Sequence, residues 1–122
     1  MDKAQAIHSF WSSFGLTAYD ENAVPDDAET PYITYEVLTD SIDYVVNLSG
    51  SVWYHSTSWA EASQKAEQIS EHLGIGGVVI PLDVGYVWIY RGTPFSQRIA
   101  DEGNAMMRRI YFNLTAEFLT DK

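Results

Sequence analysis

Apolar residues near the start of the chain follow the spacing of an α-helix. Within residues 3–14 they recur at intervals of three and one, which places them along one side of a helix: Ile7, Phe10, Trp11 and Phe14. Asp2 and Gln5 have the spacing of a capping box, and Gly15 is a typical C-terminal stop. The pattern predicts an opening helix that packs through aromatic side chains.

A second helical stripe follows residue 58. The segment "SWAE" at 58–61 has the sequence of a capping box, and the apolar residues behind it recur at intervals of three and four: Trp59, Ala62, Ala66, Ile69 and Leu73. Gly74 predicts the end of this helix. Glu61 and Lys65 predict an ion pair on its outer face, worth only about 0.2 to 0.5 kcal/mol.

Two segments between the helices have the period of two that is typical of β-strands. Residues 32–38 and 44–55 predict an antiparallel hairpin joined by the polar turn "TDSID". Gly50 lies in the middle of the second segment, where a residue without a side chain predicts a bulge or a bend.

The C-terminal half predicts three further strands, at residues 77–80, 86–91 and 108–119. The last has the clearest alternation, and we expect one set of its side chains to point inward: Ile110, Phe112, Leu114, Ala116 and Phe118. Residues 16–31 and 92–107 show no regular period and are predicted to be irregular.

The order of the predicted elements is α-β-β-α-β-β-β. Because both helices are apolar on one side only, we expect them to lie on a single face of the sheet. The predicted fold class is α+β: a two-layer sandwich, a mostly antiparallel sheet of about five strands with two helices on one face. We expect a single domain that spans residues 1–122.

Composition agrees with a folded, soluble domain. The 122 residues are 46% hydrophobic and 14% aromatic, which is well outside the composition of disordered proteins. No apolar run approaches the roughly 18 residues that span a bilayer, and the first residues lack the order of a signal peptide. We therefore expect no membrane partner. The absence of cysteine excludes disulfides and thiolate chemistry.

The charge of the chain opposes binding to nucleic acid. Seven Lys and Arg residues stand against seventeen Asp and Glu residues, which gives a formal net charge of -10. Because DNA-binding proteins neutralise phosphates with basic side chains, we expect no tight DNA binding.

Candidate catalytic residues are not found. His8, His55 and His72 are not at the spacing of metal ligands, and no glycine-rich elbow presents a serine as a nucleophile. The segment "GIGG" at 74–77 follows a helix, the reverse of a phosphate-binding loop. We predict no catalytic, metal-binding or cofactor-binding residue and no enzymatic activity.

Several segments together give the chain a resemblance to a known family. The acidic loop leading into "TPYITYEV", the strand "YVVNLSGSVWYHS", the helix "SWAEASQKAEQISEHLG", and the later "GYVWIYRGTPFSQ" and "RRIYFNLTAEFL" occur in that order over nearly the whole chain. In this order the chain resembles the tail terminator proteins of long-tailed bacteriophages and prophages, also called tail completion or minor capsid proteins.

The resemblance implies a structural virion protein. It implies a small α+β subunit that assembles into a ring, usually a hexamer in that family, which caps the tail tube and joins it to the head connector while DNA passes through. Its implied partners are other copies of itself, the tail tube and the head-connector proteins, with no cofactor and no catalysis. The implied location is the tail-head junction of the virion, after synthesis in the cytoplasm of the bacterial host.

Two irregular segments supply candidate interface residues for such a ring. The first is bounded by prolines and carries Asp26, Asp27 and Glu29; the second carries Phe95 as an apolar anchor and Arg98. Four of the seven basic residues lie between positions 91 and 109. Because a ring needs two different patches that fit each other, a proline-restrained acidic loop and a basic-aromatic segment are suitable halves.

Two other classes of protein fit the same sequence. An immunity or inhibitor protein could direct its acidic surface at a basic partner such as a nuclease, and this size of charge would speed that association. A hydrolase that uses scattered carboxylates is the third interpretation, and a deep pocket holding a carboxyl with a perturbed pKa would indicate it.

Overall fold

The computed structural model describes residues 1–36, 45–101 and 103–119, and these form an α+β fold, as predicted. Within them the chain forms two helices and six strands in the order α1 (Lys3–Ser12), β1 (Thr17–Asp20), β2 (Tyr32–Tyr35), β3 (Val45–His55), α2 (Ala60–Leu73), β4 (Val78–Pro81), β5 (Tyr86–Ala100) and β6 (Met107–Leu119).

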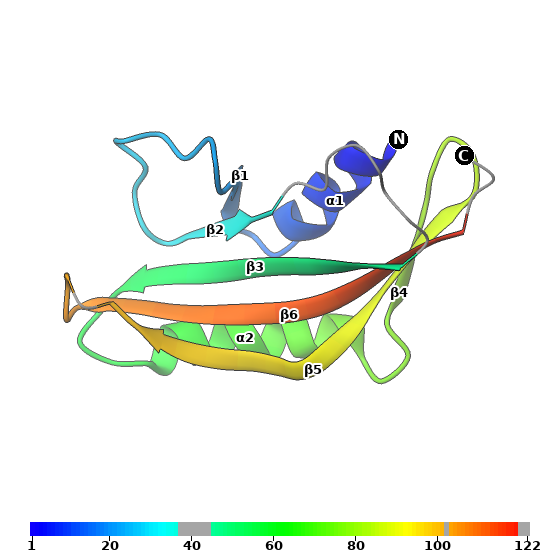
Figure 1. Ribbon diagram of the computed structural model, residues 1–122. Coiled ribbons are helices and arrows are strands. Elements are labelled where there is room, and N and C mark those ends of the chain that lie inside the picture. The colour runs from blue at the N-terminus through cyan, green and yellow to red at the C-terminus, as the bar shows by residue number, and fades with distance from the viewer. Residues whose placement is uncertain (37–44, 102, 120–122) are drawn as a thin grey trace.

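The strands form one mixed sheet in the order β1-β2-β3-β6-β5-β4 (Figure 1). β1 pairs with β2 in parallel, and every other neighbouring pair is antiparallel. The sheet is mostly antiparallel, as predicted, but it has six strands and curls into a half-barrel, so the prediction of a two-layer sandwich with about five strands was wrong. Long strands with the usual right-handed twist curl readily, and β1 adds a strand that the sequence pattern did not indicate.

Both helices pack against the concave face of this sheet, as predicted. Phe10 on α1 and Phe14, which follows that helix, contact the ring of His72 on α2, so the two helices meet over the sheet. The predicted inward residues of β6 are all buried with them: Ile110, Phe112, Leu114, Ala116 and Phe118. Figure 1 views the opposite face, with α2 behind β5 and β6.

The helix boundaries follow the predicted signals in part. At α1 the capping box forms as predicted, with the N–H of Gln5 donating to Asp2 Oδ1 at 2.8 Å and Gln5 Oε1 accepting from the Asp2 N–H. At α2 the capping box does not form, because Ser58 Oγ accepts from the N–H of Ala60 and Trp59 takes the cap position. Gly74 ends α2 with a φ of 61°, as predicted.

The predicted Glu61–Lys65 ion pair is absent from the part of the chain that the structure describes. Lys65 Nζ donates instead to the carbonyl oxygen of Phe14 and to Gln68 Oε1, both at 2.7 Å. The bond to Phe14 ties α2 to the residues that follow α1, whereas Gln68 lies on α2 itself. An exposed ion pair between Glu61 and Lys65 would contribute little in comparison.

Two predictions of irregular structure were wrong. Residues 17–20 form β1, because pairing with β2 over four residues satisfies their backbone groups although the side chains show no alternation. Residues 92–100 continue β5 along β6. There the pairing shifts between Arg91 and Ser96, so five residue steps of β5 face two of β6, and this irregularity hides the period of two.

Gly50 does not mark a bulge. The register between β3 and β6 runs without a shift from Val45 opposite Glu117 to His55 opposite Met107. Gly50 is needed instead for a close approach, because a Cβ atom there would lie 2.7 Å from the ring of Trp11. The predicted strand residues 37–38 and 44 and the turn "TDSID" lie outside the described residues.

Neither α1 nor α2, the helices within the described residues, is long and apolar enough to cross a lipid bilayer.

Candidate functional site

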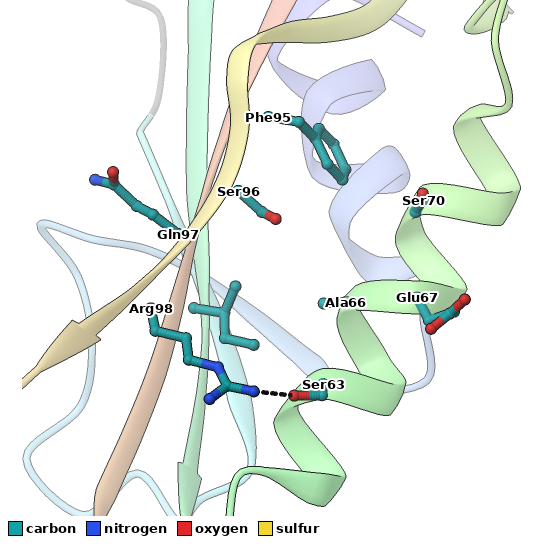
Figure 2. Close-up of a pocket in the computed structure, with 9 residues that line it drawn as sticks. Ser63, Ala66, Glu67, Ser70, Phe95, Ser96, Gln97 and Arg98 are labelled. Carbon is teal, nitrogen blue, oxygen red and sulfur yellow. Dashed lines mark hydrogen bonds between the residues drawn. The ribbon is translucent and has the colours of Figure 1, made fainter.

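A groove lies between α2 and the second half of β5. It has a volume of about 440 Å³. Figure 2 shows Phe95 and Ser96 directed from β5 toward α2, whereas Gln97 points away from the helix. The opposite directions of Ser96 and Gln97 follow from the strand register. Ser96 pairs with the buried Phe112, whereas Gln97 pairs with the half-exposed Tyr111, whose side chain lies on the other face of the sheet.

Small side chains on α2 keep the groove open. Ser63, Ala66 and Ser70 line it from the helix at intervals of three and four residues, which places them on one side of α2. Glu67 lies beside them on the exposed surface (Figure 2). A larger residue at any of these three positions would fill the space next to the strand.

The backbone edge of β5 is open along this groove. β4 pairs only with residues 86–89 of β5, and within the described chain no strand pairs with the outer edge beyond Ile89. In Figure 1 this part of β5 forms the lower border of the sheet. Such an edge presents unpaired N–H and C=O groups, which can bind another strand.

Arg98 lies at the entrance of the groove and is exposed. Its guanidinium group lies 4.8 Å from the ring centroid of Trp59, and Nη2 donates to Ser63 Oγ at 3.3 Å (Figure 2). The guanidinium of Arg108 also lies over Trp59, at 5.4 Å, and donates to the carbonyl oxygens of Ser56 and Thr57. Trp59 therefore holds two cations at one corner of the molecule.

Phe95 is not a freely exposed anchor. Its half-buried ring packs against Phe112, with centroids 5.6 Å apart, and the guanidinium of Arg91 lies 4.5 Å above it. Arg91 donates in turn to the carbonyl oxygens of Ser70 and Gly74, at the C-terminal end of α2 where a cation is favoured. Phe95 therefore packs at the edge of the core, while its proposed place at an interface stays a prediction.

The acidic candidates lie apart from this groove. Asp26, Asp27 and Glu29 are exposed in the loop between β1 and β2, which projects from the sheet in Figure 1. None of the three makes a hydrogen bond or ion pair with another described residue. The structure therefore separates the acidic loop from Phe95 and Arg98 within one subunit, so the two can meet only between subunits.

The uncovered face of the sheet carries a row of aromatic side chains. Tyr19 contacts Tyr32, Tyr32 contacts Trp53, and the guanidinium of Arg109 lies 4.6 Å from the Trp53 ring. Trp53 Nε1 donates to Thr34 Oγ1 at 2.8 Å. At the other end of this face, four apolar residues are each 52% to 58% exposed: Val45, Val79, Tyr86 and Leu119. Exposed apolar groups of this kind are typical of surfaces that contact other proteins.

The polar groups near His8 do not form a site. Its Nδ1 lies 2.7 Å from the hydroxyl of Tyr35, and its Nε2 lies 3.2 Å from Ser12 Oγ. Burial raises the pKa of Tyr35, and the Asp20 carboxylate raises it further. Both His8 and Ser12 are exposed on the surface of α1, and neither lines the groove. No group of three or more metal-ligating side chains occurs within the described residues.

Sequence reasoning missed the groove and the open edge. It grouped Phe95 with Arg98, and both line the groove, but it predicted residues 92–107 to be irregular and so missed that β5 continues beyond β4. Trp59 was interpreted only as part of a helical stripe. Its contacts with an arginine of β5 and an arginine of β6 join residues that are far apart in the sequence, so the local pattern did not indicate them. The small residues Ser63, Ala66 and Ser70 were the available signal.

Comparisons with known proteins identify the fold. No family model matches the chain, and no curated protein matches it significantly. Among solved structures, a chain from the virion of a native gene transfer agent particle matches with a TM-score of 0.63 and 21% sequence identity, covering 97% of this chain and 95% of that chain. At this identity the likeness shows that the two chains share a fold over nearly their whole lengths.

Proposed function

We propose that this protein is a structural subunit of a phage-like virion and that it assembles into a ring of identical copies. The observation that carries the proposal is the shared fold, over 97% of the chain, with a chain of a gene transfer agent virion. The finer role, which the resemblance in the sequence implies, is that of a tail terminator. In that role the subunits form a ring, which is usually hexameric in the family that the chain resembles. The ring caps the tail tube at the tail-head junction and joins it to the head connector.

The surface of the molecule supports assembly rather than catalysis. One subunit offers two surfaces that do not contact each other, an exposed acidic loop and an open strand edge beside a cationic corner. A ring uses two different patches of each subunit, because each copy must contact one neighbour on either side. We propose no catalytic residue and no cofactor for this role.

The net charge fits a channel that passes DNA without retaining it. A formal charge of -10 repels phosphates, so a ring of this chain would hold DNA weakly. A gel-shift assay with duplex DNA at low salt is the most sensitive test, because low ionic strength enlarges any electrostatic attraction. Binding below micromolar concentration would contradict passive passage of DNA.

Assembly of the purified protein tests the proposal directly. We expect ring-shaped particles by negative-stain microscopy, formed by the protein alone or on the end of a purified tail tube. An immunity or inhibitor protein would instead remain monomeric and bind one basic partner in a salt-dependent manner.

A further inference from the structure

We propose that the open edge of β5 at residues 96–100 binds the β1 edge of a second copy of this chain, so that the sheet continues from one subunit into the next. This inference rests on the proposed ring, and it specifies which strands make the contact. β1 ends the sheet on the side opposite to β5 and β4, and among the described strands none pairs with its outer edge. One chain therefore carries two different open edges, as a head-to-tail contact requires.

The outer edge of β4 is the less suitable partner surface. β4 has four residues, and it ends in Pro81, which has no N–H to donate. The free part of β5 carries five residues with paired, regular geometry along β6, from Ser96 opposite Phe112 to Ala100 opposite Arg108. A regular neighbour of this kind fixes the backbone of the edge before a partner binds, which lowers the entropy lost on docking.

The direction of pairing follows from the topology. β1 is parallel to β2, and three antiparallel pairs then separate β2 from β5, so β1 and β5 run in opposite directions within one subunit. Rotation about an axis along the strands leaves every strand direction unchanged. In a ring whose sheet continues between copies, β1 of one copy must therefore lie antiparallel to β5 of the next.

One antiparallel register matches the side chains on both faces. With Asp20 opposite Arg98, Tyr19 lies opposite Ile99 and Ala18 lies opposite Ala100. The register keeps each residue on its own face. Within one subunit, the strand partners of Asp20 and Arg98 belong to the buried face, so Asp20 and Arg98 lie on that face as well. Ile99 pairs with Arg109 and therefore lies on the uncovered face. Opposite charges and aromatic-to-branched pairs are the cross-strand pairs that stabilise a sheet.

The groove provides space for the added strand. Ser63, Ala66 and Ser70 are small, and the volume of about 440 Å³ lies beside the β5 edge where inward side chains of a new strand would point. Arg98 is exposed, and its guanidinium has one hydrogen bond to a described side chain, Ser63. A guanidinium carries five N–H donors, so Arg98 can donate two hydrogen bonds to a carboxylate without losing that bond.

Cysteine cross-linking tests the contact, because the natural chain has no cysteine and gives no background. Residues directly opposite in an antiparallel pair have Cα atoms about 4.5 to 5.5 Å apart, within the range for a disulfide. We expect the Ala18→Cys/Ala100→Cys variant to form a ladder of covalent multimers under oxidation, up to the full ring. Each single-cysteine variant should stop at dimers, and Ala18→Cys/Ile80→Cys, which tests the β4 edge, should form no ladder.

A charge exchange tests the register. Asp20→Arg or Arg98→Asp alone should raise the protein concentration for half-assembly by about tenfold or more, because like charges would face each other. The double variant restores an opposite-charge pair and should assemble within a few fold of the wild type, with thermal melts confirming that each variant folds. A double variant no better than the weaker single variant would overturn this register.

The outcomes separate this inference from the proposed function. If the wild type forms rings but Ala18→Cys/Ala100→Cys stays uncrosslinked, or if the Ile80 variant forms the ladder, the strand contact is wrong and the ring stands. If the wild type forms no ring either alone or with tail tubes, the proposed function fails, and the contact fails with it.

Discussion

The ring of Trp11 lies directly against the backbone of Gly50. A Cβ atom on residue 50 would come within 2.7 Å of Cη2 and 2.8 Å of Cζ2 of that ring. The indole is also stacked on Tyr35, the residue paired with Gly50 on β2, with an interplanar angle of 13° and centroids 6.5 Å apart. The fully buried Trp11 therefore fixes α1 on the sheet through a contact that only glycine permits.

Gly50→Ala should destabilise the protein by about 1 to 3 kcal/mol, because the added methyl group overpacks the contact with Trp11. Denaturant unfolding measures this loss. Trp11→Phe is also expected to destabilise, since it removes buried ring volume, but the smaller ring leaves room for the methyl group. The double variant should be more stable than the sum of the two losses predicts, and simple additivity would show that the two sites do not interact.

Phe112→Ala should lower the free energy of unfolding by about 3 to 5 kcal/mol, because the side chain is fully buried in the core. Tyr111→Ala, the next residue on the same strand, should cost clearly less, since Tyr111 is half-exposed on the uncovered face. Both are measured by urea titration. Equal losses would mean that the two faces of β6 contribute equally to the core, contrary to the structure.

Asp26→Lys with Asp27→Lys should leave the melting temperature nearly unchanged, because both side chains are exposed and make no polar contact with another described residue. The same double variant should prevent ring formation or tail joining, since it reverses the charge of the acidic loop. Thermal melts, light-scattering mass and a complementation assay measure these effects. A double variant that still completes tails would remove the loop from the interface.

Phe95→Ala should affect both stability and assembly. The ring packs on Phe112 under Arg91, so its loss leaves a cavity at the edge of the core, and we expect a cost below the 3 to 5 kcal/mol of a fully buried phenylalanine. Assembly must therefore be compared at a temperature where the variant is fully folded. A folded variant that assembles like the wild type would show that Phe95 serves the core alone.

The stability of the fold should decrease at alkaline pH. Burial raises the pKa of Tyr35 above its ordinary value of 10.0, and the Asp20 carboxylate adds to that shift. As the pH rises, Tyr35 therefore loses its proton in the unfolded chain before it does so in the folded protein. The contribution of the protonated Tyr35 to stability is complete below about pH 10 and declines as the pH rises toward the pKa of the folded state. Tyr35→Phe should weaken the decline measured by denaturant unfolding, and an unchanged decline would contradict a contribution from this hydroxyl.

The elements with strong periodicity were predictable from the sequence. The stripes of α1 and α2 and the alternation of β6 reflect burial of one face, which directly selects apolar residues at a fixed period. β1 and the second half of β5 lack that signal. Their side chains are largely exposed or half-exposed at the edges of the sheet, so only backbone pairing defines them, and backbone pairing leaves no pattern in the sequence.

The candidate site was predictable only as a set of residues. Composition identified an acidic loop and a basic-aromatic segment, and the structure places Arg98 beside Trp59. The groove depends on long-range geometry: α2 must lie beside a strand that outruns its neighbour β4. The small residues of α2 are the local signal, but they do not encode that relation, because the length of β4 and the shift at Arg91 are set elsewhere in the sheet.

The mass and shape of the assembled protein test the central claim most directly. Each subunit has a mass of 13.8 kDa, so light scattering and negative-stain microscopy can distinguish a monomer from a closed ring without ambiguity. We expect closed rings with a fixed number of subunits, formed by the purified protein or when purified tail tubes are added. A protein that remains monomeric at every concentration, and that neither forms rings on tail tubes nor binds them, would contradict it.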